Sequence, residues 1–510
     1  MKTSRLHVGW VCTGILVSVL CSCSASRSSL SPTRKYSPEE LRRDYDTYRN
    51  VLEAHHPSLY WYTPRDSMNM YFDYGKTQVK DSMTEPEFRR LLAYVTAKIS
   101  CGHTSIRPSK AWSRYSDTVR LGRMFPLSMK VWENAVLVTQ SLIRRDSIFR
   151  RGTPLLSING IPARKIVDSL LEFISTDGYN TTHKYQVLSN RGSFGPLYTT
   201  VFGMSNYYDV EYLDSLGTPR KTRVPSYQPP RDTGRIFNRP RQQPVIVPQP
   251  SRRDRRRQRQ DEVRQLRIDT VTQTAMMYLG SFGRGYRLKK FFRNSFRTLN
   301  KMGIGHLIID VRGNGGGSVN NSTLITRYLA DHRFRLADSL YAVRKRSAYQ
   351  QHIADHFWNK LFIDFFTSRK KDGYYHFGYF ERHYFKPKER NHYEGKVYVL
   401  TGGNSFSATT LFASVLRPQE NVIILGEETG GGAYGNSAWL IPEATLPLTG
   451  VRFRLPLFRL VINKNIPKDG KGVQPEIYSG PTIENIRNGA DYKLDRALEL
   501  IQADKQSGQK

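Results

Sequence analysis

The 510-residue sequence predicts an α/β protein of two to four domains. From about residue 270 onward, apolar runs without alternation are separated by stretches of helical periodicity, which is typical of a sheet covered on both faces. The residues before that point instead show amphipathic helices followed by short strands. Because 38% of the residues are hydrophobic, the chain can form real cores, which excludes a wholly disordered protein.

The first 22 residues have the features of a bacterial lipoprotein signal peptide. A short positive start precedes a mostly apolar run, Val8 to Leu20, that is too short to span a bilayer as a helix. The following Cys21-Ser22-Cys23 completes a lipobox-like pattern, in which Cys23 becomes the lipid-carrying N-terminus. Plain secretion with an ordinary cleavage site is the alternative. We expect lipid anchoring to a bacterial membrane, at the outer membrane or the periplasmic face, with residues 23–34 as a tether.

The cysteine count agrees with this placement. If Cys12 and Cys21 leave with the signal peptide and Cys23 is acylated, Cys101 alone remains, so the mature chain has no intrachain disulfide. A lone cysteine can serve as a nucleophile, but it is more often a buried small apolar residue.

Residues 35–110 are predicted to form a helical domain. Ser37, Pro38 and Glu40 make a helix start with a capping box, and a second helix begins near Thr84. Residues 115–225 are predicted to be β-rich, with strands near 125–131, 135–138 and 155–158 and a helix over about 163–174.

Residues 226–268 are predicted to be an exposed basic linker. The stretch 220–267 holds fifteen lysines and arginines against four acids, which is a large share of the formal +34 of the chain. Sequence of this kind, rich in proline and like charges, buries too little surface to order itself. The alternative is an electrostatic anchor to an anionic membrane surface. Aromatic residues for stacking bases are nearly absent, so no nucleic-acid partner is expected.

Residues 270–490 are predicted to form the α/β domain, with an aromatic, basic insertion at 333–393. Strands are expected at 306–311, 397–401 and 422–426, and helices at 291–301, 319–330 and 408–416. Residues 491–510 are expected to be a C-terminal helix and tail.

Two glycine-bearing loops follow buried strands in this domain. In residues 310–317, three consecutive glycines before a helix expose N–H groups that bind either a phosphate or the oxyanion of an attacked carbonyl. The spacing matches neither a P-loop nor a dinucleotide fingerprint. In residues 401–408, Ser407 lies at a strand-to-helix corner where the Ala408 N–H can face the same oxygen. Taken alone, Ser407 would be a simple helix N-cap.

Taken together, these loops resemble the serine peptidases of family S41, which include the C-terminal processing peptidases, the tricorn core and the interphotoreceptor retinoid-binding protein repeats. The matching segments are residues 310–317, Asn404-Ser405-Phe406-Ser407-Ala408, Gly426-Glu427-Glu428-Thr429-Gly430-Gly431-Gly432 and Gly470-Lys471-Gly472-Val473-Gln474-Pro475-Glu476-Ile477. The resemblance implies a crotonase- or ClpP-like core, Ser407 as nucleophile, and the Gly316 and Ala408 amides as oxyanion hole. It also implies a PDZ-like module within residues 115–225.

One departure from the family decides the expected base. Processing peptidases place a lysine twenty-five residues after the serine, whereas that position is Gly432 in this chain. A serine hydroxyl still needs a proton acceptor. Tricorn-like members take a histidine from the N-terminal helical region, and Gly102-His103-Thr104 resembles that motif. His103 is therefore the predicted base.

The acid that orients the base is predicted by counting along the Gly-Val-x-Pro segment. Tricorn-like members place an acid three residues before its glycine, which indicates Asp469 here. Lys468-Asp469-Gly470 is also a strong turn signal by itself, so a turn aspartate is the alternative. Glu427 and Glu428 are further candidates.

The predicted function is an exported, lipid-anchored serine endopeptidase that forms an acyl-enzyme on Ser407. The alternative is a catalytically silent peptide- or lipid-binding protein on the same fold. His55 and His56 precede a proline and suit a helix end, and the remaining histidines show no recognised ligand spacing. We expect a peptide or protein substrate, no metal and no organic cofactor.

Overall fold

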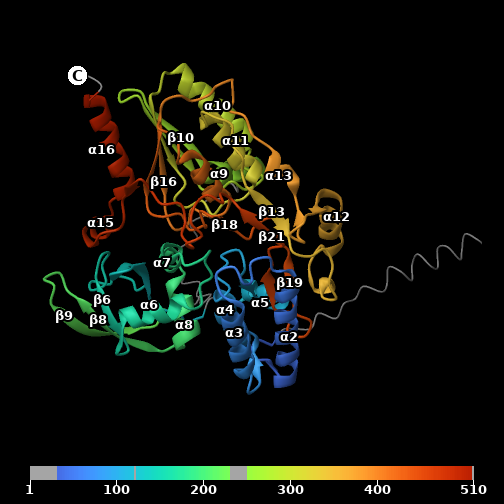
Figure 1. Ribbon diagram of the computed structural model, residues 1–510. Coiled ribbons are helices and arrows are strands. Elements are labelled where there is room, and N and C mark those ends of the chain that lie inside the picture. The colour runs from blue at the N-terminus through green and yellow to red at the C-terminus, as the bar shows by residue number, and fades with distance from the viewer. Residues whose placement is uncertain (1–30, 120–121, 230–249, 508–510) are drawn as a thin grey trace, which may run out of the picture.

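A computed structural model describes residues 31–119, 122–229 and 250–507. Figure 1 shows a large sheet with its helices in the upper half, and the N-terminal helices beside a smaller β-rich region below. This architecture confirms the predicted α/β class. Cys23 and the rest of the predicted signal peptide lie outside the described residues, so lipid anchoring stays a prediction.

The N-terminal region is helical, as predicted. Its elements are α2 (Pro38–His55), α3 (Arg65–Thr77), α4 (Glu85–Ala97), α5 (Lys110–Thr118) and the paired strands β1 (Lys35–Tyr36) and β2 (Met83–Thr84). The Ser37 side chain accepts the Glu40 N–H while the Glu40 carboxylate accepts the Ser37 N–H, so the predicted capping box is present. The sequence analysis did not anticipate α3.

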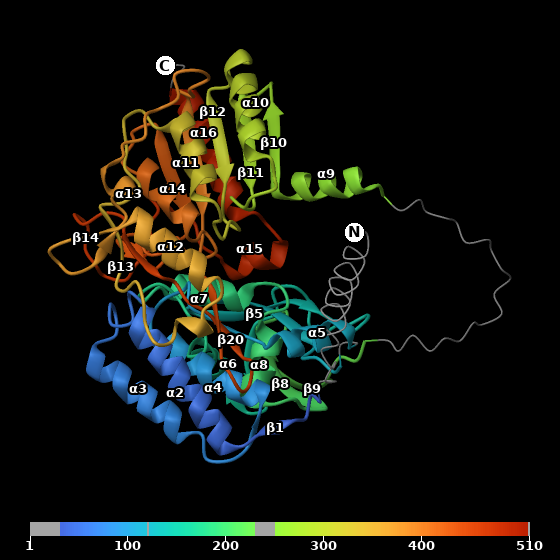
Figure 2. The ribbon, with the colours of Figure 1, turned by 90° about the vertical axis from the view of Figure 1, so that its right-hand side faces the viewer.

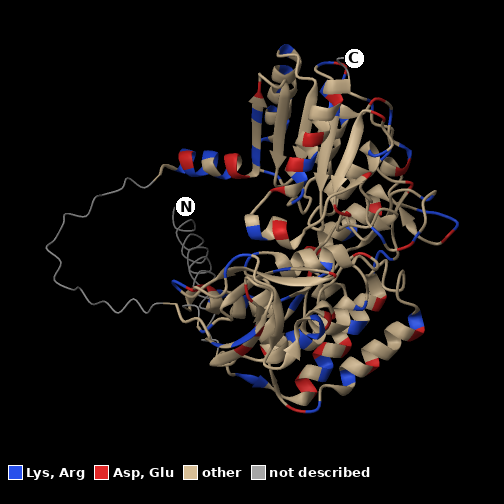
Figure 3. Cartoon of the chain, turned by 90° about the vertical axis from the view of Figure 1, so that its left-hand side faces the viewer, with Lys and Arg blue, Asp and Glu red and all other residues tan. Residues whose placement is uncertain are grey.

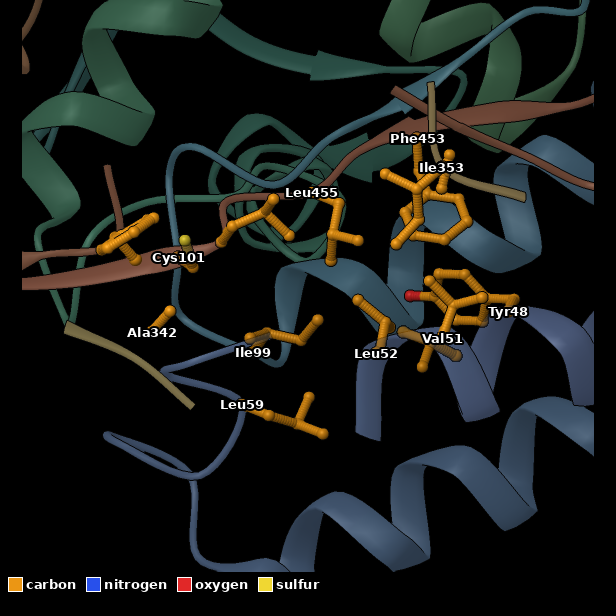
Figure 4. Close-up of a cluster of buried hydrophobic side chains, with 14 of the residues drawn as sticks. Tyr48, Val51, Leu52, Leu59, Ile99, Cys101, Ala342, Ile353, Phe453 and Leu455 are labelled. Carbon is orange, nitrogen blue, oxygen red and sulfur yellow. The ribbon is translucent and has the colours of Figure 1, made fainter. Parts of the chain in front are cut away.

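Residues from the far end of the chain complete the core of these helices. Figure 4 shows Tyr48 and Leu52 of α2 in one buried cluster with Phe453 and Leu455. The rings of Tyr48 and Phe453 meet edge-on, with centroids 5.2 Å apart. The strands β3 (Ile106–Arg107), β20 (Arg452–Arg454) and β19 (Glu443–Thr445) form one small sheet. The helical region is therefore fixed to the C-terminal half by apolar packing and by shared strands.

The region that follows is built from two antiparallel sheets and three helices around its own core. The strands are β4 (Leu127–Trp132), β5 (Ala135–Ser141), β6 (Leu155–Ile158), β7 (Ile161–Pro162), β8 (Tyr207–Leu213) and β9 (Pro219–Pro225), in the orders β4-β5 and β7-β6-β8-β9. The helices are α6 (Ala163–Leu171), α7 (Thr181–Ser189) and α8 (Phe194–Phe202). The expected strands and the first helix occur, whereas α7 and α8 were not anticipated. The PDZ-like assignment remains a prediction.

The prediction of an unstructured linker up to residue 268 is wrong for its last part. Residues Arg252–Val263 form helix α9, and Arg264–Asp269 form strand β10 at the edge of the large sheet. Ser251 caps α9 by accepting the Asp254 N–H. Figure 3 shows the helix standing away from the body, with basic and acidic residues interspersed along it. These arginines thus lie on a solvated helix. Strand β10, which follows the helix in sequence, pairs with β11 (Thr274–Leu279).

The large sheet has the order β10-β11-β12-β16-β17-β22, and all its strands except β10 run parallel. Its other strands are β12 (His306–Asp310), β16 (Lys396–Thr401), β17 (Val422–Gly426) and β22 (Ile477–Tyr478). One face packs on α10 (Leu288–Lys301), α11 (Val319–Leu329) and α14 (Ala408–Leu416), and the other on α16 (Tyr492–Ser507). Figure 1 shows α16 on the side of the sheet opposite α10 and α11. The sheet is thus covered on both faces, as its unbroken apolar strands predict.

The insertion, residues 333–393, packs onto the α/β domain and joins a second sheet. It contains β13 (Ser339–Ala342), a 3₁₀ turn η1 (Gln350–His352), α12 (His356–Phe366), β14 (Ser368–Arg369), β15 (Tyr375–His376) and α13 (Gly378–Arg382). The sheet has the order β14-β15-β13-β21-β18, with β18 (Gly435–Asn436) and β21 (Phe458–Val461) from the domain itself. A short helix, α15 (Ile483–Asn488), precedes α16. Throughout these described ranges, no helix is both long enough and apolar enough to cross a membrane.

His56 lies just beyond the end of α2, where it supports the loop that carries His103. Its Nδ1 accepts the Ser58 N–H at 3.2 Å, and its Nε2 lies 2.8 Å from the Thr104 hydroxyl. Because Nδ1 accepts a hydrogen bond, the ring is neutral with its proton on Nε2. Burial lowers the pKa of His56 to about 3, and the charge of Arg459 acts in the same direction.

The neutral state of His56 predicts acid destabilisation. In the unfolded chain, His56 has its ordinary pKa of about 6.5 and binds a proton below that pH, whereas in the folded chain it stays neutral down to about pH 3. The contribution of His56 to stability is therefore complete near neutrality and falls as the pH is lowered. When the pH is lowered from about 7.5 to about 5, His56 should reduce the free energy of unfolding by about 2 kcal/mol. Urea denaturation of the wild type and of His56→Gln should show a smaller loss in the variant. The exposed His356→Gln is the control, and equal losses in all three proteins would refute the assignment.

Candidate active site

Ser407 occupies a sharp corner between β16 and α14. Its backbone has φ 58° and ψ −119°, a conformation that a residue with a side chain adopts only under strain. The side chain is half-buried and lines two neighbouring cavities. A strained corner that presents a hydroxyl to a cavity is the arrangement expected of a nucleophile, and it argues against a simple helix cap because the Ser407 side chain accepts no capping hydrogen bond.

The two predicted oxyanion donors lie beside Ser407. The Ala408 N–H belongs to the first residue of α14, where an amide has no partner within the helix. Gly316 has φ +96°, and a Cβ placed on it would lie 2.8 Å from the Ser407 Cβ and 3.0 Å from the Ala408 nitrogen. Only glycine permits this approach. In this conformation the Gly316 N–H donates to Asn314 Oδ1 at 2.9 Å, so it must exchange that partner to serve an oxyanion.

The structure brings His103 to the same place from the N-terminal region. Its ring packs against Phe406, the residue before Ser407, with centroids 4.7 Å apart. A Cβ on Gly102 would come within 2.5 Å of the Phe406 ring, so glycine is required for this contact. His103 is 3% exposed, and among the described residues neither ring nitrogen has a hydrogen-bond partner. A buried imidazole with both nitrogens free is available to accept a proton.

The carboxylate beside His103 is Asp177, which the sequence analysis missed. Its Oδ1 lies 3.8 Å from His103 Nδ1, and no other carboxylate of the described residues comes as close to the ring nitrogens. Asp177 is itself 2% exposed. It accepts the Gly102 N–H at 2.8 Å and the Gly432 N–H at 3.3 Å. Asp177 precedes a glycine in the loop between α6 and α7, a local pattern that signals only a turn.

Asp469, the acid predicted from the sequence, does not make this contact. It is solvent-exposed, and its Oδ1 accepts the Lys471 N–H at 3.0 Å, which is the turn interpretation. Glu427 instead pairs with Lys493 at 2.7 Å. Glu428 accepts the Gly472 N–H at 2.6 Å and so holds the Gly-Val-x-Pro segment. The carboxylate that the structure places beside His103 is thus Asp177 and not Asp469.

Gly432, which stands where processing peptidases have their lysine, leaves no room for a side chain. A Cβ there would lie 2.5 Å from the Gly435 carbonyl oxygen. The Gly432 amide bonds instead to Asp177, the carboxylate beside the histidine. Of the lysines in and before the Gly-Val-x-Pro segment, Lys468 donates to the Trp61 carbonyl, and Lys464 and Lys471 are exposed. A histidine-based site is thus the arrangement that these loops can form.

His183 is a second histidine that the sequence analysis did not single out. It also stacks on Phe406, with centroids 4.9 Å apart, and lines the same cavity as His103. Its Nδ1 lies 2.6 Å from the Gly403 carbonyl oxygen, so Nδ1 carries the proton and donates it. Burial lowers the pKa of His183. The ring is a packing partner of Phe406 and also a rival base that experiment must separate from His103.

Cys101, two residues before His103, is buried. Burial raises the pKa of its thiol to about 11, so the sulfur stays protonated at neutral pH and is not a nucleophile. No group of three or more histidine, cysteine or acidic side chains in the described part of the chain is arranged to hold a metal ion.

The cavity in front of Ser407 joins these groups. It has a volume of about 680 Å³ and is lined by Ser407, His103, His183, Gly316, Asn404 and Arg454 among others. The walls come from the N-terminal region, the middle region and the α/β domain. The arrangement places a hydroxyl, an imidazole and helix-terminal amides around one space. These are the groups that nucleophilic attack on a carbonyl needs.

Comparisons with known proteins concern the family and the fold of this chain. The family description "Peptidase family S41" matches residues 273–479. Mature CPAF is similar in structure, with 14% identity, TM-score 0.60 and coverage of 91% of this chain and 96% of that chain. A CPAF mutant has 13% identity, TM-score 0.64 and coverage of 91% and 98%. A putative peptidase from Parabacteroides merdae has 16% identity, TM-score 0.43 and coverage of 91% and 97%.

At these identities the solved structures show a shared fold only. No curated protein matches the chain. The family match covers the loops that carry Gly316, Ser407 and Gly432, and the CPAF fold extends over 91% of the chain. Residues 273–479 of this chain therefore match peptidase family S41.

Proposed function

We propose that the chain is a serine endopeptidase that cleaves peptide bonds through an acyl-enzyme on Ser407. The observation that carries the proposal is the contact between the Gly102-His103 loop and Phe406, which sets an unpaired, buried imidazole beside the strained serine. His103 accepts the Ser407 proton as the hydroxyl attacks the carbonyl, and later returns it to the leaving amine. Water then hydrolyses the acyl-enzyme.

Asp177 orients His103 in this scheme. The 3.8 Å between Asp177 Oδ1 and His103 Nδ1 is longer than a hydrogen bond, and catalytic hydrogen bonds often tighten only when substrate binds. A carboxylate at Nδ1 would leave Nε2 as the nitrogen that takes the Ser407 proton, and its charge would stabilise the imidazolium that forms. The oxyanion is stabilised by the Ala408 amide and, once released from Asn314, by the Gly316 amide.

A catalytically silent binding protein is the rival function. The bond from the Gly316 amide to Asn314 Oδ1 favours it, because one predicted oxyanion donor is occupied. The strained serine and the free imidazole favour catalysis, since neither is needed to bind a peptide.

Substitution of the nucleophile and the base should show that they act as a unit. Ser407→Ala and His103→Ala should each abolish cleavage of an unfolded protein such as casein, and the double variant should be hardly slower than either, because members of one catalytic unit are non-additive. His183→Gln is the control, and we expect it to keep most of the activity. Activity in His103→Ala together with inactivity in His183→Gln would assign the base to the other histidine. No hydrolysis by the wild type would favour the binding function.

A matched pair of substitutions tests the orienting acid. Asp177→Asn should lower kcat by about 10²- to 10⁴-fold with little change in KM, because the amide loses the charge that stabilises the imidazolium. The kcat of Asp469→Asn should stay within about twofold of the wild-type value, since Asp469 lies in an exposed turn. The circular dichroism spectra of both variants check that the fold is kept. The opposite ranking of the two variants would restore Asp469 as the acid.

We further propose that the chain is exported and lipid-anchored through Cys23, with the basic segment that includes α9 adding a salt-sensitive attraction to anionic lipid. The support is the lipobox-like Leu20-Cys21-Ser22-Cys23 and the excess of arginine on α9. The wild type should partition into detergent when expressed in a bacterium, and Cys23→Ala should appear in the aqueous phase or remain unprocessed. Cys21→Ala is the matched control, and membrane association that persists unchanged in Cys23→Ala would contradict acylation.

A further inference from the structure

A second cavity opens beside Ser407, on a different set of walls from the one that holds His103. It has a volume of about 630 Å³, within the range of ligand pockets. We call it the apolar pocket, and its main walls are Leu336, Leu340, Phe377, Phe380, Trp439 and Leu460. Ser407, Gly317 and Ile441 line both this pocket and the cavity of His103. A peptide bond at Ser407 therefore has the general base on one side and an apolar pocket on the other.

The insertion builds much of this pocket. Leu340 belongs to β13, and Phe380 to α13, both within residues 333–393. Figure 2 shows α13 and β13 on the same side of the α/β domain as α14, the helix that begins after Ser407. The Phe380 ring meets Trp439 edge-on with centroids 4.6 Å apart, so the insertion also holds the opposite wall in place.

The backbone of the pocket wall is strained. Trp439 and Leu440 are consecutive non-glycine residues with φ of +69° and +43°, and both line the pocket. Such conformations persist only where the surrounding structure holds them, and they gather at ligand-binding sites. The turn presents two large apolar side chains to the cavity, and both stay half-exposed where they pack against the edge of the core.

The lining residues of the apolar pocket disfavour a charged substrate side chain. Among the lining residues only Arg284 carries a charge, and its side chain is exposed at the solvent side, whereas Leu336, Leu340 and Phe380 are buried. No lining residue is acidic. A charged side chain that entered the pocket would lose its hydration. The buried walls carry no charge that could compensate for this loss, because Arg284 is exposed to solvent.

We propose that the apolar pocket is a specificity site, which receives a large aromatic or aliphatic side chain from a residue that flanks the scissile bond. This inference rests on the proposed peptidase function of Ser407. Burial of a phenylalanine or leucine side chain should favour such substrates over alanine by about 10- to 100-fold in kcat/KM.

Mapping of cleavage sites in the wild type is the first test. Casein digested by the full-length protein is analysed by mass spectrometry, and phenylalanine, tyrosine, tryptophan, leucine or methionine should dominate at one of the two positions that flank the cut. Cleavage with small or charged residues on both flanks would overturn the proposal.

Filling the pocket is the second test. Ala337, which is buried and lines the pocket, is changed to phenylalanine, and the exposed Ala354 of the same insertion is changed in the same way as a control. Two internally quenched peptides are compared, identical except for phenylalanine or alanine at the preferred flank. Ala337→Phe should lower kcat/KM for the phenylalanine peptide more than for the alanine peptide, so that the ratio of the two falls toward one, and Ala354→Phe should keep the ratio of the wild type. An unchanged preference in Ala337→Phe would refute the assignment.

The two failures are distinguishable. If Ser407 of the wild type reacts with a fluorophosphonate and casein is cut without a preference for large apolar residues, the peptidase function stands and the pocket assignment falls. If neither reaction nor cleavage occurs, the proposed function itself fails. Should Ala337→Phe not fold, the cleavage map of the wild type alone still decides the proposal.

Discussion

The buried carboxylate of Asp177 joins three parts of the chain at one point. It accepts the amide of Gly102 from the N-terminal region and the amide of Gly432 from the α/β domain, and it comes from the middle region itself. Hydrogen bonds to an ionised carboxylate are stronger than those between neutral groups. These bonds hold the His103 loop against the loop of Gly432, whose Gly430 amide in turn donates to the Ser405 carbonyl of the Ser407 loop. The relative position of the two candidate catalytic side chains therefore depends on Asp177.

Glycines without side chains make the same junction possible. Gly102 lets its loop reach the Phe406 ring, and Gly316 lets the first glycine loop reach Ser407 and Ala408. The N-terminal region is held in this position because Phe453 and Leu455 complete its core and its strand β3 pairs with β20. In a family in which the serine is followed by a lysine base, such a remote loop is not needed. Here Gly432 leaves no room for a lysine, and the packing between distant segments brings His103 to the cavity that Ser407 lines.

The features predicted from the sequence are those that depend on local pattern. Unbroken apolar strands and amphipathic helices predicted the covered sheet, and the motif around Ser407 led to the corner that the structure shows. Asp177 was missed because its contact with Gly432 spans 255 positions, and nothing near it in sequence reports that partner. Asp469 was chosen by counting, although Lys468-Asp469-Gly470 forms only an exposed turn. The basic segment was judged by composition, but Ser251 caps α9 and β10 gains a ladder of hydrogen bonds with β11.

The central claim is that Ser407 is a nucleophile activated by His103 within this junction of loops. The most direct measurement is to react the purified full-length protein with a fluorophosphonate and to locate the adduct by peptide mass spectrometry, in the wild type and in His103→Ala. The account predicts an adduct on Ser407 of the wild type and a rate of labelling in His103→Ala that is lower by orders of magnitude. An adduct on another residue, or equal labelling of Ser407 in both proteins, would contradict it.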